Sequence, residues 1–191
     1  MFAENISKEQ LNELPLIQFT GTIYVIDTPE KVAPAIADLK YHSILGFDTE
    51  TRPSFKKGRI NSTALVQLAT RDAAYLFRLN KIGFPKELQA ILATPTITKI
   101  GLGLKDDIKA LKEFADFEPE AFIDLQEIVP NYDIEVKSLK KLAGITLDIR
   151  ISKNQQLSNW ERDELSEGQQ RYAATDAWVC LEIYDRLEQA T

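Results

Sequence analysis

The stretch LGFDTET at residues 45–51 carries two carboxylates, Asp48 and Glu50, two positions apart. In an extended strand, side chains at positions i and i+2 point to the same face, so these two would stand side by side. Two negative charges at that spacing repel each other unless a cation lies between them. The pair therefore predicts a cation site, provided that other segments of the chain supply further ligands.

Two other segments carry carboxylates that could reach such a site. In KIGLGLKDDIKALKEF, a strand ends at two glycines and a helix follows, which places Asp106 and Asp107 in the first helical turn. Ligands bind at this edge of open α/β sheets, although the favourable interaction of acids with the helix macrodipole would explain both residues equally well. On the final helix, Tyr172 and Asp176 share one face, so Asp176 either points to solvent or serves a site.

Together these acids have the chemistry of a divalent metal centre. Carboxylate oxygens from three segments suit Mg²⁺ or Mn²⁺. Two such ions roughly 4 Å apart can orient a water, lower its pKa and stabilise an in-line phosphodiester displacement. Without metal, at least one of the acids should have a raised pKa. A nucleotide-binding loop is disfavoured, because GLGLKD lacks both the third glycine of GxGxxG and a GK[ST] sequence.

The elements that must position these residues alternate along the chain as in an α/β domain. We expect a mixed sheet with helices on its faces, in which the strands over 43–50, 63–70 and 73–79 form an antiparallel meander. The other expected strands cover 22–27, 96–102 and 121–125, and the expected helices cover 7–13, 30–40, 85–93, 104–114 and a long C-terminal segment. Thr28 is an expected N-cap, and Ser166 with Gln169 matches a capping box that begins the last helix.

The composition limits which classes of protein remain. With 191 residues and 44% hydrophobic content, we expect a single domain over 1–191. One cysteine, Cys180, and one histidine, His42, exclude an intrachain disulfide and leave too few soft ligands for an ordinary zinc site. The absence of a signal-peptide core and of any apolar run near 18 residues predicts a cytoplasmic protein with no membrane partner.

Charge is unevenly distributed along the chain. The net charge of −6 disfavours a broad basic surface of the kind found in tight nucleic-acid binders. Residues 113–135 contain eight acids and no Lys or Arg, which is typical of a solvated face. In contrast, Arg52, Lys56, Lys57 and Arg59 follow LGFDTET with no acid among them. This run is either an ordinary polar loop or a set of phosphate contacts beside the carboxylates.

The motifs resemble those of the DEDDy 3′–5′ exonuclease domain family, to which RNase D and the Werner syndrome exonuclease domain belong. FDTET is similar to the first motif, KIGLGLKDDIKAL to the second, and LSNWERDELSEGQQRYAATDAWVCLEIYDRL to the third, in which Tyr172 and Asp176 form the YxxxD pair. The glycine-to-Asp spacing of the second motif favours Asp107 over Asp106. The resemblance extends from about residue 20 to the end.

This resemblance implies a ribonuclease-H-like fold with a mixed five-stranded sheet flanked by helices. It also implies an enzyme that removes nucleoside 5′-monophosphates from a single-stranded 3′ end of DNA or RNA with two divalent cations, Mg²⁺ or Mn²⁺. Asp48, Glu50 and Asp176 would hold the catalytic ion, and Asp48 and Asp107 the second ion. Tyr172 would orient the attacking water or help to deprotonate it, and its unperturbed pKa of about 10 favours the orienting role. Alternatives are a catalytically weak nucleic-acid-binding or accessory module on the same fold, and an interaction protein that uses the acidic face.

Substrate contacts would have to come from local clusters, since the net charge is negative. The expected nucleic-acid-binding residues are Arg52, Phe55, Lys56, Lys57 and Arg59, with a second cationic set of Lys137, Lys140, Lys141, Arg150 and Lys153. Aromatic rings can stack on unpaired bases. Phe55 is a candidate for this role, whereas for Trp160 we favour packing behind the last helix.

Overall fold

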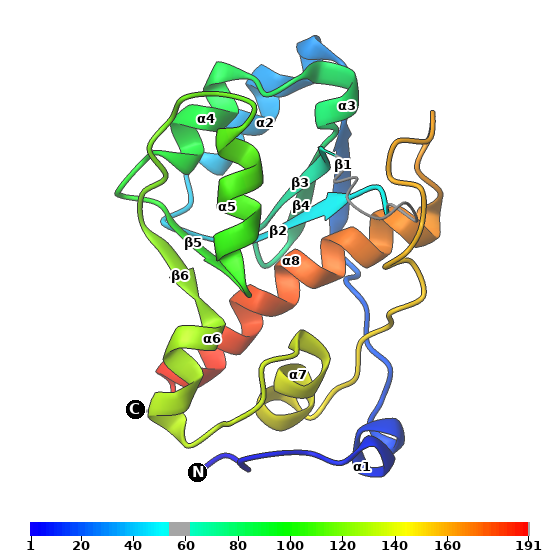
Figure 1. Ribbon diagram of the computed structural model, residues 1–191, viewed down its shortest axis with the longest axis vertical. Helices are drawn as coiled ribbons and strands as arrows, with labels where there is room; N and C mark the ends of the chain where they lie inside the picture. The colour runs from blue at the N-terminus through cyan, green and yellow to red at the C-terminus, as the bar shows by residue number, and fades with distance from the viewer. Residues whose placement is uncertain (54–61, 191) are drawn as a thin grey trace.

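The computed structural model describes residues 1–53 and 62–190, which form one mixed six-stranded sheet with helices on both faces (Figure 1). The strand order is β1-β4-β3-β2-β5-β6. The strands are β1 (Thr22–Ile26), β2 (Ile44–Thr51), β3 (Thr63–Ala69), β4 (Ala73–Phe77), β5 (Thr98–Gly101) and β6 (Phe122–Asp124). The helices are α1 (Lys8–Glu13), η1 (Pro29–Lys31), α2 (Val32–Leu39), α3 (Leu79–Ile82), α4 (Lys86–Leu92), α5 (Leu104–Lys112), α6 (Leu125–Ile128), η2 (Val129–Tyr132), α7 (Leu139–Leu147) and α8 (Glu167–Glu188).

The pairing of the strands puts β2 near the middle of the sheet. β2 is antiparallel to β3 and parallel to β5, and β3 is antiparallel to β4, which confirms the predicted meander. The expected count of five strands is wrong by one. The short β6 pairs in parallel with β5, and the backbone N–H of Lys99 also donates to the carbonyl of Ala121, so the sheet extends to a sixth strand.

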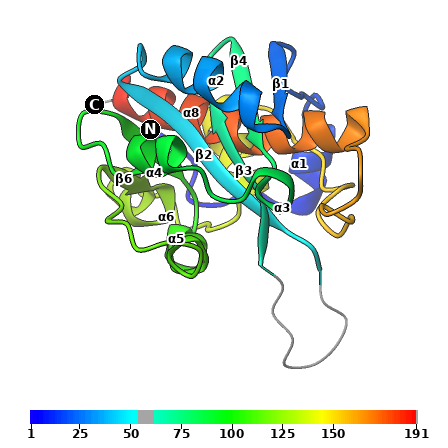
Figure 2. The same ribbon diagram turned by 90° about the horizontal axis from the view of Figure 1, so that it is seen from above.

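Each face of the sheet has its own apolar core. On one face, side chains such as Phe47, Val66 and Leu68 pack against α2, α4 and α5. The other face is covered by α8, which runs diagonally across the molecule with α7 beyond it (Figures 1 and 2). Every residue of β3 is buried, as expected for a strand covered on both faces. This explains why its sequence is almost continuously apolar.

Helix α8 lies unusually close to β2. Its N-terminus has the predicted capping box, in which Ser166 and Gln169 each accept from the other's backbone N–H. Its inner face carries Ala173 and Ala177, which are fully buried. A Cβ atom at Gly46 would overlap the carbonyl oxygen of Ala177. The close approach of strand and helix therefore requires glycine at position 46, and it brings the acids of β2 next to those of α8.

One local expectation was wrong. The strand expected over 73–79 ends at Phe77, because the chain turns into the short helix α3. Thr28 is the N-cap residue of η1, as expected, although its side chain makes no capping hydrogen bond to the backbone. Among the helices of the described residues, none combines the length and apolar character that crossing a bilayer requires.

Candidate active site

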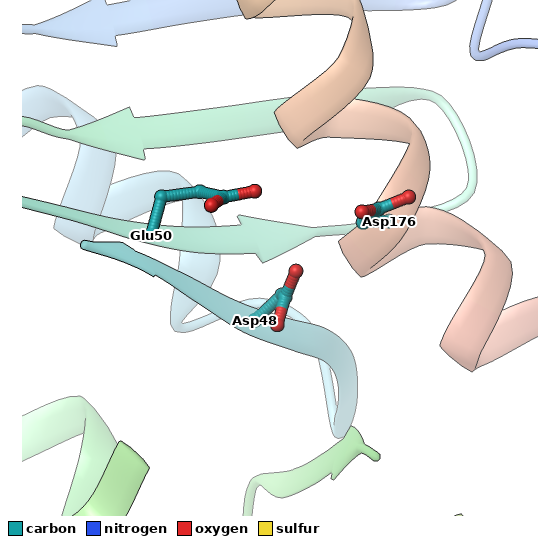
Figure 3. A group of neighbouring side chains, drawn as sticks. All are labelled: Asp48, Glu50 and Asp176. Atoms are coloured by element: carbon teal, nitrogen blue, oxygen red, sulfur yellow. The ribbon is translucent and has the colours of Figure 1, made fainter. Parts of the chain in front are cut away.

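The acids from the first and third motifs converge at the contact between β2 and α8. Asp48 and Glu50 extend from one face of β2, and Asp176 extends toward them from α8 (Figure 3). One carboxylate oxygen from each residue lies within 4.8 Å of the others. Glu50 and Asp176 are 9% and 8% exposed and so have little contact with water, whereas Asp48 is half-buried. The expected side-by-side arrangement of Asp48 and Glu50 is therefore present.

Asp107 borders this group from α5. Its carboxylate accepts a hydrogen bond from the hydroxyl of Thr49, the residue between the two acids of β2. Its charge also contributes to raising the pKa of Asp48. Asp106, in contrast, is exposed. Of the two adjacent acids, Asp107 is thus the one near the carboxylate group, although it lies outside the three whose oxygens gather within 4.8 Å.

Asp124 fixes the start of α5 and was missed by the sequence analysis. Its carboxylate accepts from the backbone N–H groups of Gly103, Leu104 and Gln126, each at 2.9 Å. Gly103 has φ +71°, a left-handed conformation that favours glycine. These contacts hold the first turn of α5, which carries Asp107, against the ends of β5 and β6. An acid at the end of AFIDL, followed directly by a helix, was the signal for a capping role.

Tyr172 connects the carboxylate group to a buried tryptophan. It lies one helical turn before Asp176 on α8, and its interaction with that carboxylate lowers the pKa of Asp176. Its ring contacts that of Trp160, with 6.0 Å between the centroids. Trp160 is fully buried in a cluster that includes Leu65, which confirms the packing interpretation over base stacking.

The metal-free carboxylates hold protons unusually strongly. Burial, together with the charges of Asp176 and Asp107, raises the pKa of Asp48 well above its ordinary value. Burial and the same kind of repulsion raise the pKa of Glu50 to about 10. Burial raises the pKa of Asp176 to about 7, opposed by the hydrogen bond from Tyr172 and the charge of Lys153. The prediction of raised pKa values is thus confirmed.

This donor set fits hard divalent cations. Within residues 1–53 and 62–190, no Lys or Arg forms an ion pair with Asp48, Glu50 or Asp176. Buried carboxylates that lack a cationic side chain are stabilised when they share a metal ion, and Mg²⁺ and Mn²⁺ prefer such oxygen ligands. The arrangement can therefore bind a cation and hold an anionic group beside it.

A cleft of about 270 Å³ opens onto the acids. Its walls include Asp48, Tyr172 and Asp176, together with two lysines, Lys140 and Lys153. Lys140 lies in the first turn of α7, and Lys153 lies in the segment between α7 and α8. The cleft thus combines carboxylates with the cationic side chains that a phosphate backbone would contact.

The predicted substrate-binding residues fall into three groups. Arg52 is exposed, and its guanidinium pairs with Glu161 at 3.1 Å. Phe55, Lys56, Lys57 and Arg59 lie outside the described residues. In the second set, Lys140 and Lys153 line the cleft, whereas Lys141 donates to Asn5 and Arg150 donates to the carbonyl of Leu14.

Comparison with known proteins places the chain in a family. A family model described as 3′-5′ exonuclease matches residues 23–191. The chain is 31% identical over 188 residues to the bifunctional 3′-5′ exonuclease/ATP-dependent helicase WRN of Mus musculus, covering 92% of this chain but only 13% of the mouse protein.

Solved structures agree with this placement. The EXO domain of Nibbler from Aedes aegypti has a TM-score of 0.79 and 27% identity, with 91% of each chain covered. RNase D of Escherichia coli shares the fold, with a TM-score of 0.76, 23% identity, and coverage of 88% of this chain and 44% of that chain. With its three carboxylates gathered on a ribonuclease-H-like sheet, the chain belongs to the DEDDy 3′–5′ exonuclease family of phosphodiester hydrolases.

Proposed function

We propose that this protein is a metal-dependent 3′–5′ exonuclease that releases nucleoside 5′-monophosphates from the 3′ end of single-stranded DNA or RNA by a two-metal mechanism. The observation that carries the proposal is the gathering of Asp48, Glu50 and Asp176 within 4.8 Å, with Asp107 beside them. A site that only bound nucleic acid would have no need for buried carboxylates, because they repel phosphate.

Each acid has a distinct role in the proposal. Asp48, Glu50 and Asp176 would hold one Mg²⁺ or Mn²⁺, and Asp48 and Asp107 would hold the second. Such ions would supply an activated water and neutralise charge at the attacking and leaving oxygens. The pKa of Tyr172 is raised by burial and by Asp176 and Glu50, so its hydroxyl stays protonated. Tyr172 orients the attacking water through a hydrogen bond, the role that a raised pKa favours.

The substrate strand lies in the cleft, where Lys140 and Lys153 contact its phosphates. A second set of nucleic-acid contacts stays a prediction from the sequence. These residues follow Glu50 in the chain and are Arg52, Phe55, Lys56, Lys57 and Arg59. A cytoplasmic location and a single domain over 1–191 also stay predictions from the sequence.

Digestion of 5′-labelled single-stranded DNA and RNA of one sequence tests this function. Wild type, Asp48→Ala and the control Asp106→Ala, which removes the adjacent exposed acid of α5, are compared in Mg²⁺, Mn²⁺ or EDTA. We expect a metal-dependent ladder that shortens from the 3′ end for wild type and Asp106→Ala, and none for Asp48→Ala. Binding of both strands without any ladder would instead support the accessory-module alternative, and a ladder from well-folded Asp48→Ala would exclude the site assignment.

A further inference from the structure

Gln67 in β3 is a buried amide with unsatisfied hydrogen-bonding groups. Its side chain is fully buried, and neither Nε2 nor Oε1 has a hydrogen-bond partner among the described residues. A buried amide in this state destabilises a fold, since both groups lose their water without replacement. Apolar side chains of similar volume, such as Leu or Met, would avoid this loss. The presence of glutamine at this buried position therefore indicates a function other than packing.

The sheet register places Gln67 next to the carboxylate group. Gln67 lies directly opposite Asp48 on the neighbouring antiparallel strand, and opposite Leu76 on its other side. Opposed residues of an antiparallel pair project from the same face with Cβ atoms about 4.5–5.5 Å apart. This is the face that α8 covers with Asp176. In this row across the sheet, Asp48 is thus the polar neighbour of Gln67.

We infer that Gln67 is a positioning residue for the metal centre, whose amide donates a hydrogen bond to the Asp48 carboxylate when Asp48 binds a cation. This inference rests on the proposed function. A carboxylate bound to metal retains lone pairs that accept hydrogen bonds, and donors behind a ligand fix its orientation. A neutral amide can do this without competing with the cation, whereas a lysine at position 67 would form an ion pair with Asp48.

The inference and a purely structural role for Gln67 predict different results for Gln67→Leu. This substitution removes both polar atoms at similar volume. If Gln67 only fills space, metal binding should be unchanged. If Gln67 positions Asp48, the affinity for metal should fall by about 10- to 100-fold, as is typical when a partner of a metal ligand is lost. In both cases the metal-free protein should be at least as stable as wild type, so lost affinity cannot be attributed to unfolding.

The experiment measures Mn²⁺ binding by calorimetry without nucleic acid, alongside the melting temperature of the metal-free protein. Gln67→Leu is compared with wild type and with Leu68→Met, a fully buried neighbour whose side chain packs on the opposite face of the sheet. We expect the Mn²⁺ dissociation constant to rise at least tenfold for Gln67→Leu and to change less than twofold for Leu68→Met. Cleavage by Gln67→Leu should require correspondingly more Mn²⁺ and should recover in part at saturation.

Gln67→Met provides a second variant if Gln67→Leu does not fold. A dissociation constant within twofold of wild type for a folded variant would overturn the inference while leaving the metal centre intact. Failure of the proposed function has a different signature, namely wild type that binds no Mn²⁺, or Asp48→Ala that binds it as wild type does.

Discussion

The carboxylates of Asp48, Glu50 and Asp176 share one buried space, so ionisation of each disfavours ionisation of the others in the metal-free protein. A bound divalent cation reverses this relation, because every negative charge then strengthens binding. At the scale of single residues, the carboxylates that would bind the metal also lower the stability of the metal-free fold. Stability and activity should therefore respond in opposite directions when one of these acids is neutralised.

Glu50→Gln should abolish cleavage and stabilise the metal-free protein at pH 8. The amide keeps the shape of the side chain and needs no proton, whereas Glu50, with a pKa of about 10 in the folded state, must take up a proton when the chain folds at pH 8. Since one pKa unit corresponds to about 1.4 kcal/mol, we expect the free energy of unfolding to rise by roughly 1–3 kcal/mol. Urea unfolding in EDTA measures this change, and Glu87→Gln on the exposed surface of α4 is the control. A less stable Glu50→Gln protein would contradict the argument.

The stability of the metal-free protein should fall as pH rises from 5 to 8. Glu50 and Asp176 have folded-state pKa values of about 10 and about 7, above those of the unfolded chain. The folded state thus binds more protons than the unfolded state. The contribution of these two groups to the free energy of unfolding is fully present below about pH 4 and is lost as the pH rises toward their folded-state pKa values. Melting temperatures in EDTA across this range provide the measurement. Saturating Mn²⁺ should flatten or reverse the trend, because metal competes better as protons leave.

Tyr172→Phe should lower kcat by about 10²-fold, within the range for a positioned group in proton transfer. The variant also removes the interaction that lowers the pKa of Asp176, so this pKa should rise. As the pH falls below 7, the activity of the variant should therefore decrease more than that of wild type. A pH profile of kcat with single-turnover kinetics separates these effects. An unchanged kcat would exclude Tyr172 from the positioning of water.

The acids of the site could be predicted from the sequence because their spacing has a direct geometric meaning. Asp48 and Glu50 follow the two-residue period of a strand, and Tyr172 and Asp176 follow the four-residue spacing of a helix. The contacts of Asp124 with Gly103 and Leu104, and the role proposed for Gln67, could not be predicted in this way. Each depends on contacts between segments distant in the chain, and these appear only once strand register and helix position are known.

At the scale of elements, the contact between α8 and β2 determines whether the acids meet. Gly46→Ala should move α8 away from the sheet, because the added Cβ overlaps the carbonyl of Ala177. We expect a destabilisation of about 1–3 kcal/mol, as for other overpacked cores, together with weaker metal binding through displacement of Asp176. Unfolding and Mn²⁺ calorimetry measure the two effects.

Gly168→Ala on α8 is the matched control for Gly46→Ala. A Cβ at Gly168 would come no closer than 3.5 Å to the side-chain amide of Gln155, an ordinary contact. Because alanine favours helix over glycine by up to about 1 kcal/mol, this control should be neutral or stabilising. If the two variants have equal stability and equal Mn²⁺ affinity, the close approach of Gly46 to Ala177 does not determine the position of Asp176.

The elements themselves were predictable to different degrees. β3 and α8 were predicted well, since one is an apolar run bounded by turn residues and the other has both a capping box and helical periodicity. α3 was missed because its four residues are too few to show any periodicity. The resemblance implied only five strands, but the apolar residues over 121–125 predicted the strand that pairs with β5 as β6. Of these two short elements, the one with a strand-like sequence was predicted and the single helical turn was not.

At the scale of the whole molecule, a net charge of −6 makes nucleic-acid binding depend on a few local cations. Replacing Lys140 and Lys153 together by Ala should weaken binding of all sequences similarly and reduce the salt dependence. For single strands the slope of log K against log salt changes by about 0.7 for each lost phosphate contact. Fluorescence anisotropy over a salt series measures this slope, with Lys86→Ala on α4 as the control. An unchanged slope would place the substrate elsewhere.

The position of α8 after all six strands in the chain has a consequence for biosynthesis. Asp48 and Glu50 leave the ribosome long before Asp176, on the order of ten seconds earlier at translation rates of about 5–20 residues per second. Until α8 docks on β2, the carboxylate group is incomplete. The proposed nuclease activity therefore arises only after α8 has been synthesised and has docked on β2.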